Sequence, residues 1–149
     1  MDIESLLRLL NAHKVKYVII GAAAFPVHGY ARATLDVDIF IEPSETNARR
    51  CLTALKKFGY DVSVIDVEEL LKKKILIRQY LVEIDIHPHV RGVTFSRVWK
   101  NKVRAKMGTV AAYFASLSDL IKMKKAAGRP KDKEDLKALR QLQKRKKSG

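Results

Sequence analysis

Two segments of the 149-residue chain alternate apolar and acidic residues, and this alternation constrains the fold more than any other feature. Successive side chains of a strand point to opposite faces. A strand through "RATLDVDIFIE", residues 32–42, would therefore place its aliphatic residues on one side and Asp36 and Asp38 on the other. The later segment "VEIDIHP", residues 82–88, repeats the pattern with Asp85. Both segments predict strands of one sheet, with a buried apolar face and an opposite face that carries carboxylates.

Carboxylates this close together repel and raise one another's pKa, so a positive partner is expected between them. Magnesium and manganese prefer oxygen ligands, and a pair of such ions clamps the attacking and leaving oxygens of a phosphoryl transfer. The alternative is an exposed sheet face whose acids pair with some of the 30 Lys and Arg residues. Because two strands carry acids and Gly21 follows a third, a metal site is the favoured interpretation.

Helical and strand patterns alternate along the chain and define the expected fold class. Apolar spacing, capping residues and breaks give the element order. The expected helices are 2–13, 44–58, 66–74, 116–127 and 132–146, with a short helix over 22–30 and a helical turn over 95–102; the expected strands are 15–21, 32–42, 60–65, 75–78 and 80–88, with one or two more over 104–116. This order predicts an α/β (α+β) fold with a mixed β-sheet flanked by helices.

Length and composition favour one domain over residues 1–149. The chain is 47% hydrophobic, which is enough for a real core, and no run approaches the roughly 18 apolar residues of a membrane span. We therefore expect a cytoplasmic protein with no membrane contact. The single cysteine, Cys51, excludes an internal disulfide and falls on an apolar helix stripe, so it is expected to be buried.

Positive charge is concentrated in the second part of the chain. Residues 1–96 carry 13 Lys+Arg and 12 Asp+Glu, whereas residues 97–149 carry 17 and 4. We expect a catalytic core over about 1–91 and a basic, mainly helical C-terminal part over about 92–149. Such a charge distribution indicates a polyanion partner, most simply RNA. The alternative is a solvated helix face followed by a frayed tail.

Gly21 ends one strand and opens a helix, where free amides can hold a phosphate. The order of a glycine turn, two acids and a later acid resembles the G[GS] plus DxD signature of the DNA polymerase beta-like nucleotidyltransferase superfamily. The resemblance is to its small prokaryotic branch near the abortive-infection AbiEii-type toxins. The matching residues are His28, Gly29, Arg32, Thr34, Asp36, Asp38 and Asp85, and the C-terminal "LIKMKKAAGRPKDKEDLKAL" adds Lys125, Arg129, Lys131, Asp132 and Asp135.

This resemblance implies a nucleotidyltransferase fold, a nucleoside triphosphate as substrate, and Mg²⁺ or Mn²⁺ as cofactor. Asp36 and Asp38 would bind both ions, and Asp85 would bind one and help to deprotonate the attacking hydroxyl.

The resemblance also assigns a nucleotide-binding group of residues. Gly21 and Ala22 would lie at the phosphates; Ala22 replaces the family's second glycine or serine, so triphosphate binding is expected to be weakened or altered. Arg32 and either Lys125 or Arg129 are candidates for triphosphate or acceptor contacts, with surface ion pairs as the alternative.

The expected acceptor is RNA, with tRNA as the favoured form, and the toxin resemblance implies a neutralising antitoxin partner. Alternatives are modification of a small molecule such as an aminoglycoside, nucleotidyl transfer to a protein, and a non-catalytic nucleic-acid-binding module of the same fold. For the histidines, packing or hydrogen bonding is favoured, with His87 at the edge of the site. Trp99 and Tyr113 are interpreted as core or rim aromatics, and base stacking by them is left open.

Overall fold

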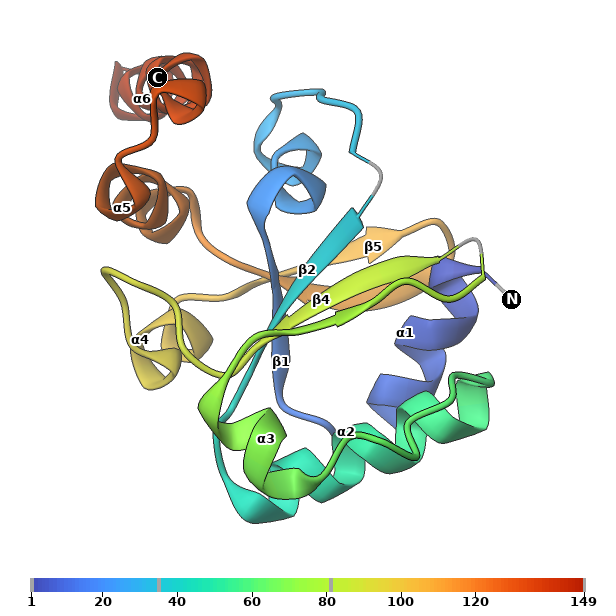
Figure 1. The fold of residues 1–149 in the computed structure, drawn as a ribbon. Coiled ribbons are helices and arrows are strands. Elements are labelled where there is room, and N and C mark those ends of the chain that lie inside the picture. The colour runs from blue at the N-terminus through green and yellow to red at the C-terminus, as the bar shows by residue number, and fades with distance from the viewer. Residues whose placement is uncertain (1, 35, 81, 149) are drawn as a thin grey trace.

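The computed structural model describes residues 2–34, 36–80 and 82–148, and its centre is a mixed β-sheet with helices on its faces (Figure 1). Within these residues the sheet has six strands in the order β3-β4-β2-β1-β6-β5. The strands are β1 (Tyr17–Ile20), β2 (Asp36–Ile41), β3 (Ile75–Ile77), β4 (Glu83–His87), β5 (Val103–Met107) and β6 (Val110–Phe114). The predicted α/β fold with a mixed sheet is confirmed.

The helices lie close to their predicted positions, because most are bounded by the capping residues that the sequence offers. They are α1 (Ile3–Ala12), α2 (Glu45–Phe58), α3 (Val67–Lys72), α4 (Phe95–Lys100), α5 (Leu117–Ala127) and α6 (Lys133–Ser148), with 3-10 turns η1 (Gly21–Ala24), η2 (Pro26–His28) and η3 (Pro130–Asp132). The Ser44 side chain accepts the Asn47 amide at the start of α2, and Gly59 ends that helix in the left-handed region. The short helix expected over 22–30 is instead two 3-10 turns.

Strand pairing places two segments that are far apart in the sequence on either side of β1. This strand pairs antiparallel with β2 and parallel with β6, and β2 pairs parallel with β4. The hairpin of β5 and β6 therefore extends the sheet from within the basic C-terminal part, in addition to the helices there. Because β2 runs opposite to β1, the start of β2 lies beside the end of β1, where Ile20 faces Asp38.

Burial along β2 explains why the acidic face is open at one end only. Ile39 and Ile41 belong to the core, which includes residues of α1 and α2. On the opposite face Phe40 packs edge-on against Phe95 of α4, with ring centroids 5.2 Å apart. The second half of β2 is thus buried on both faces, and only the half that carries Asp36 remains accessible. No helix in the described part of the chain has the length and hydropathy to cross a bilayer.

The prediction of a strand over residues 60–65 is wrong. This segment forms an irregular turn, because the Asp61 carboxylate accepts the amide and hydroxyl of Ser63 at 3.0 and 2.6 Å. The side chain of Gln79 satisfies the backbone of Asp61 in place of a neighbouring strand. Such local bonds of an aspartate compete with a sheet ladder. Val64, which lies in this segment, is 82% exposed.

Two other strands begin later than predicted. β2 begins at Asp36; before it, the Arg32 side chain bonds Asp135 and the Thr34 hydroxyl donates to the Asp36 carbonyl. β4 spans Glu83–His87. The predicted segments also include Leu35 and Leu81, which lie outside the described residues.

Candidate active site

Parallel pairing of β2 and β4 brings the three predicted acids together. Asp38 lies directly opposite Asp85, and Asp36 lies opposite Glu83. The Asp85 side chain is 13% exposed, whereas the side chains of Asp36 and Asp38 are 37% and 30% exposed. The register therefore concentrates negative charge at the open end of the acidic face.

A possible metal-binding set consists of Asp38, Asp85 and His87. One carboxylate oxygen from each acid and one ring nitrogen of His87 lie within 4.8 Å of one another. The Nε2 atom of His87 is 2.8 Å from Asp38 Oδ1. Carboxylate oxygens suit magnesium and manganese, and an imidazole is also a common ligand of transition metals. The donor set therefore fits a divalent cation, and Asp36 stands outside it.

Arg78 supplies the positive charge that the acids require. It follows β3 and reaches Asp85 Oδ1 through Nη1 at 2.6 Å, Asp36 Oδ2 through Nη2 at 3.4 Å, and Glu83 Oε2 through Nε at 3.1 Å. The hydrogen bond to Asp85 and the surrounding acids raise the pKa of the Arg78 guanidinium. Asp36 and Asp85 thus share one guanidinium, whereas Asp38 faces His87.

The turn after β1 passes directly against Asp38. Gly21 has φ of +66°, and a Cβ atom at this position would lie 2.7 Å from Asp38 Oδ2. Both the backbone conformation and the close approach require glycine. Ala22, the next residue, is partly buried and lines the same cleft.

A cleft of about 620 Å³ opens above the acids. Its lining includes Gly21, Ala22, the three acids, and apolar side chains of α5. Seven cationic residues also line it: Arg32, Lys74, Arg78, Arg91, Lys124, Arg129 and Lys131. A lining with more than twice as many cations as acids suits an anionic ligand placed beside a metal ion.

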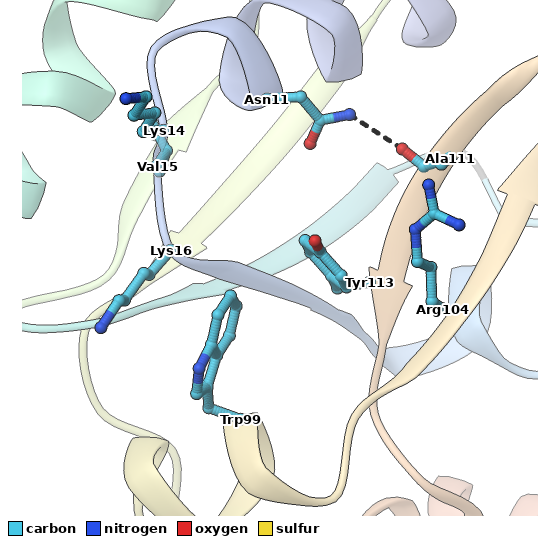
Figure 2. A pocket seen from close by; sticks show the side chains of 8 residues that line it. All are labelled: Asn11, Lys14, Val15, Lys16, Trp99, Arg104, Ala111 and Tyr113. Carbon is cyan, nitrogen blue, oxygen red and sulfur yellow. Dashed lines mark hydrogen bonds between the residues drawn. The ribbon is translucent and has the colours of Figure 1, made fainter.

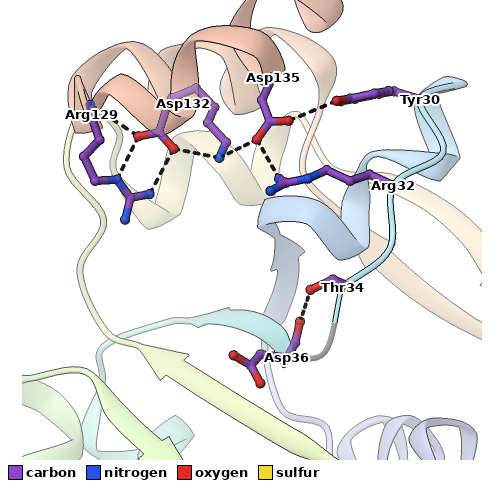
Figure 3. Close-up of polar contacts among 8 residues, drawn as sticks. Tyr30, Arg32, Thr34, Asp36, Arg129, Asp132 and Asp135 are labelled. Carbon is purple, nitrogen blue, oxygen red and sulfur yellow. Dashed lines mark hydrogen bonds and ion pairs between the residues drawn. The ribbon is translucent and has the colours of Figure 1, made fainter.

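Buried acids of the C-terminal part hold one wall of this cleft in place (Figure 3). Asp135, which is 4% exposed, accepts the Tyr30 hydroxyl at 3.0 Å and Arg32 Nη1 at 2.6 Å. Lys124 Nζ lies 3.1 Å from carboxylate oxygens of both Asp132 and Asp135. This network links the segment before β2 to α5 and α6. For Arg32 it corresponds to the alternative interpretation, in which the side chain forms an ion pair instead of contacting a nucleotide.

Arg129 is fixed by the second buried acid of that network. Its Nε and Nη2 atoms reach the two carboxylate oxygens of Asp132 at 2.8 and 3.1 Å. These hydrogen bonds, together with those from Lys124, lower the pKa of Asp132 to about 2. The Arg129 side chain remains 54% exposed, so it is oriented and still available to the cleft.

Most of the predicted nucleotide-binding residues meet at the cleft, but Lys125 does not. Gly21, Ala22, Arg32 and Arg129 line it, whereas Lys125 is exposed on α5 and is not among the described residues that form the lining. Lys124, one residue earlier, takes that place. Consecutive helical residues point about 100° apart, so the choice between them depends on how α5 packs.

Sequence reasoning missed Arg78 and underrated His87. The strict alternation of β4 already placed His87 on the acidic face beside Asp85, so a usable signal existed. Arg78 lies in the connection between β3 and β4, whose turn carries no recognisable motif, so its return to the acids could not be read from spacing.

The conservative interpretations of two other residues are confirmed. His28 is 8% exposed, bonds Ala115 O through Nε2 at 2.8 Å, and has a pKa lowered by burial. Cys51 is buried in the core, which raises the pKa of its thiol to about 12 and leaves it unreactive at neutral pH.

An acidic face of two interior strands beneath a cation-lined cleft is the arrangement expected of a nucleotidyltransferase, and family comparison agrees. Residues 1–145 match the family described as "Nucleotidyltransferase of unknown function (DUF6036)". The chain belongs to this family. A comparison with curated proteins finds no match.

Two solved structures share the fold. One is TM1012 from Thermotoga maritima, named as a candidate nucleotidyltransferase, with a TM-score of 0.61 and 17% identity over 89% of this chain and 86% of that one. The other is the lincosamide antibiotic adenylyltransferase LnuA in its lincomycin-bound form, with a TM-score of 0.61 and 16% identity over 95% and 98% of the two chains. At such low identity these similarities establish the fold alone.

Proposed function

We propose that the protein transfers a nucleoside monophosphate from a nucleoside triphosphate onto a hydroxyl group, with pyrophosphate as the leaving group. The observation that carries this proposal is the register that sets Asp38 opposite Asp85, with the Gly21 turn packed against Asp38. In this position a phosphate chain bound over the turn lies beside the carboxylates.

The acids have distinct proposed roles at a pair of Mg²⁺ or Mn²⁺ ions. Asp38 and Asp85 would hold one ion once the 2.6 Å ion pair between Arg78 and Asp85 opens, with His87 either orienting Asp38 or ligating directly. Asp36 would join them once its own 3.4 Å ion pair with Arg78 opens. The bound ions would neutralise the triphosphate and favour ionisation of the attacking hydroxyl.

Proton transfer and anion binding are assigned to residues of this chain. Asp85 accepts the proton of the attacking hydroxyl as the acceptor oxygen bonds to the α-phosphorus and the bond to pyrophosphate breaks. Arg129, oriented by Asp132, contacts the triphosphate. Ala22 keeps the backbone amide of the family's glycine turn and adds a methyl group, which would weaken the hold on the phosphates.

RNA is the proposed acceptor, because a polyanion complements both the +14 net charge and the excess of cations around the cleft. The same acceptor would suit a toxin of the AbiEii-type branch, which would bring an antitoxin as a protein partner. The fold shared with the lincosamide adenylyltransferase makes a small hydroxyl compound the second candidate.

The acceptor can be identified with α-labelled nucleoside triphosphates, Mg²⁺ or Mn²⁺, and three acceptor pools: total RNA, total protein, and a lincosamide or aminoglycoside. We expect label in RNA with the wild type and none with Asp38→Asn. Glu45→Gln is the control, since it removes an exposed carboxylate of α2 that pairs with Arg49 and is not among the described residues of the cleft lining. Label in protein or drug would replace the RNA assignment, and no label in any pool would contradict the enzyme proposal.

A further inference from the structure

A second concave site lies at the other end of β1. It has a volume of about 400 Å³, and its lining includes Trp99, Tyr113 and Lys16 (Figure 2). Lys16 precedes β1 and Gly21 follows it, and five residues of strand at about 3.3 Å each separate the two sites by about 17 Å. The second site is therefore too far away to belong to the catalytic cleft.

Two partly exposed aromatic rings form the floor of this site. Trp99 and Tyr113 meet at 64°, with ring centroids 5.3 Å apart, and Phe95 stacks on the indole at 5.8 Å from inside. The Asn11 side chain donates to Ala111 O at 2.8 Å and so fixes one rim. These rings are held in place by the core, and rigid, partly exposed aromatics are suitable surfaces for base stacking.

Cations surround the rings, and the described residues of the lining include no acid, although Lys16 pairs with Glu42 outside it at 3.5 Å. Figure 2 shows Trp99 between Lys16 and Tyr113, with Arg104 beyond Tyr113 and Lys14 above Lys16. A further ammonium group, that of Lys102, lies 3.9 Å from the indole centroid.

Lys14 holds a conformation that glycine would adopt at lower cost. Its φ is +57°, and its amide and that of Val15 bond the carbonyls of Asn11 and Leu10, which closes the C-terminus of α1. Glycine usually fills this position of a helix end. The chain instead places a long cationic side chain at the rim of the site, in a left-handed conformation that lysine rarely adopts.

We propose that this site binds a nucleotide unit of a single-stranded nucleic acid, with the base stacked on the Trp99 indole and its edge against Tyr113, and the adjoining phosphates held by Lys14 and Arg104. Entry of the base moves the Lys102 ammonium, which also donates to the Trp99 carbonyl at 3.2 Å, from the ring toward a phosphate. Stacking and phosphate contacts together are the usual basis of single-strand binding without sequence preference. This inference concerns binding alone and does not depend on the proposed transfer reaction.

Trp99 is the only tryptophan of the chain, so its fluorescence reports directly on this site. The experiment is a titration with a short oligouridylate in chelator and without triphosphate, so that catalysis plays no part. We expect saturable quenching, and no quenching by an abasic strand of the same length. Equal quenching and affinity with the abasic strand would overturn the base-stacking proposal.

The variants Lys14→Gly and Lys57→Gln distinguish a specific phosphate contact from unspecific attraction by the net positive charge. Lys57 is an exposed lysine of α2 and serves as the matched control. Lys14→Gly should weaken binding about fivefold at 0.1 M salt and reduce the salt slope by about 0.7, the value of one phosphate contact on a single strand. Lys57→Gln should leave both unchanged.

Two outcomes of this comparison would overturn the proposal. One is equal loss of binding in the two variants, which would mean unspecific attraction. The other is quenching by uridine monophosphate with the affinity of the oligonucleotide, which would assign the site to free nucleotides.

Discussion

Gly21→Ala tests whether the turn after β1 sets the position of Asp38. The added Cβ would lie 2.7 Å from Asp38 Oδ2, and ordinary contact begins at about 3.4 Å, so the carboxylate must move by about 0.7 Å. Metal sites tolerate errors of only about 0.2 Å in ligand distance. The φ of +66° adds a backbone cost of about 1 to 2 kcal/mol for alanine.

Gly128→Ala is the matched control, because Gly128 has φ of +61° and, among the described residues other than its chain neighbours, the heavy atom nearest to its Cβ would lie 3.8 Å away. Both variants should lose about 1 to 2 kcal/mol in urea unfolding. Mn²⁺ affinity can be measured by electron paramagnetic resonance or calorimetry. It should fall about 10-fold or more in Gly21→Ala, which is the usual effect of losing a group that orients a metal ligand, and little in Gly128→Ala. Equal Mn²⁺ affinity in the two variants would refute the reasoning that Asp38 is a ligand held by the turn.

Three further changes test other parts of the account. Asp132→Asn should cost about 2 kcal/mol at pH 7, because the pKa of Asp132 is lowered from 3.8 to about 2. A lowered carboxyl pKa stabilises the folded protein above pH 3.8, and this stabilisation is lost as the pH falls toward 2. In urea unfolding at about pH 2.5, the difference in free energy of unfolding between the wild type and Asp132→Asn should therefore be much smaller than at pH 7. An equal difference at both pH values would contradict this. Arg78→Gln removes the guanidinium that competes with a metal ion for Asp36 and Asp85. Loss of an ion pair of about 1 kcal/mol should make Mn²⁺ binding about fivefold tighter in calorimetry. Unchanged or weaker Mn²⁺ binding would speak against this competition. Lys14→Gly should raise the free energy of unfolding by about 1 kcal/mol through relief of the left-handed conformation, and a lower value in urea titration would be inconsistent with strain at this position.

The sequence predicted the acidic part of the site because strand alternation is a local property. The period of two placed Asp36 and Asp38 on one face, and the same rule applied to Asp85. Their meeting depended only on β2 and β4 becoming neighbours, which they are. Gly21 was predictable for a similar reason, since a glycine at the end of a buried strand marks a tight turn.

Features that depend on packing could not be read in the same way. The rotation of α5 about its axis decides that Lys124 rather than Lys125 faces Asp132 and Asp135, and no local pattern encodes that angle. Arg78 reaches the acids only because a hairpin turn folds back on β4. At residues 60–65 apolar alternation was outweighed by the side-chain bonds of Asp61, which close a turn and expose Val64.

The most direct test of nucleotidyl transfer compares triphosphates labelled at the α-phosphate or at the γ-phosphate, with RNA as acceptor and Asp38→Asn as control. The account predicts that the wild type adds the α-label to RNA and releases the γ-label as pyrophosphate, and that the variant does neither. Transfer of the γ-label to RNA, or equal α-label transfer by Asp38→Asn, would contradict it.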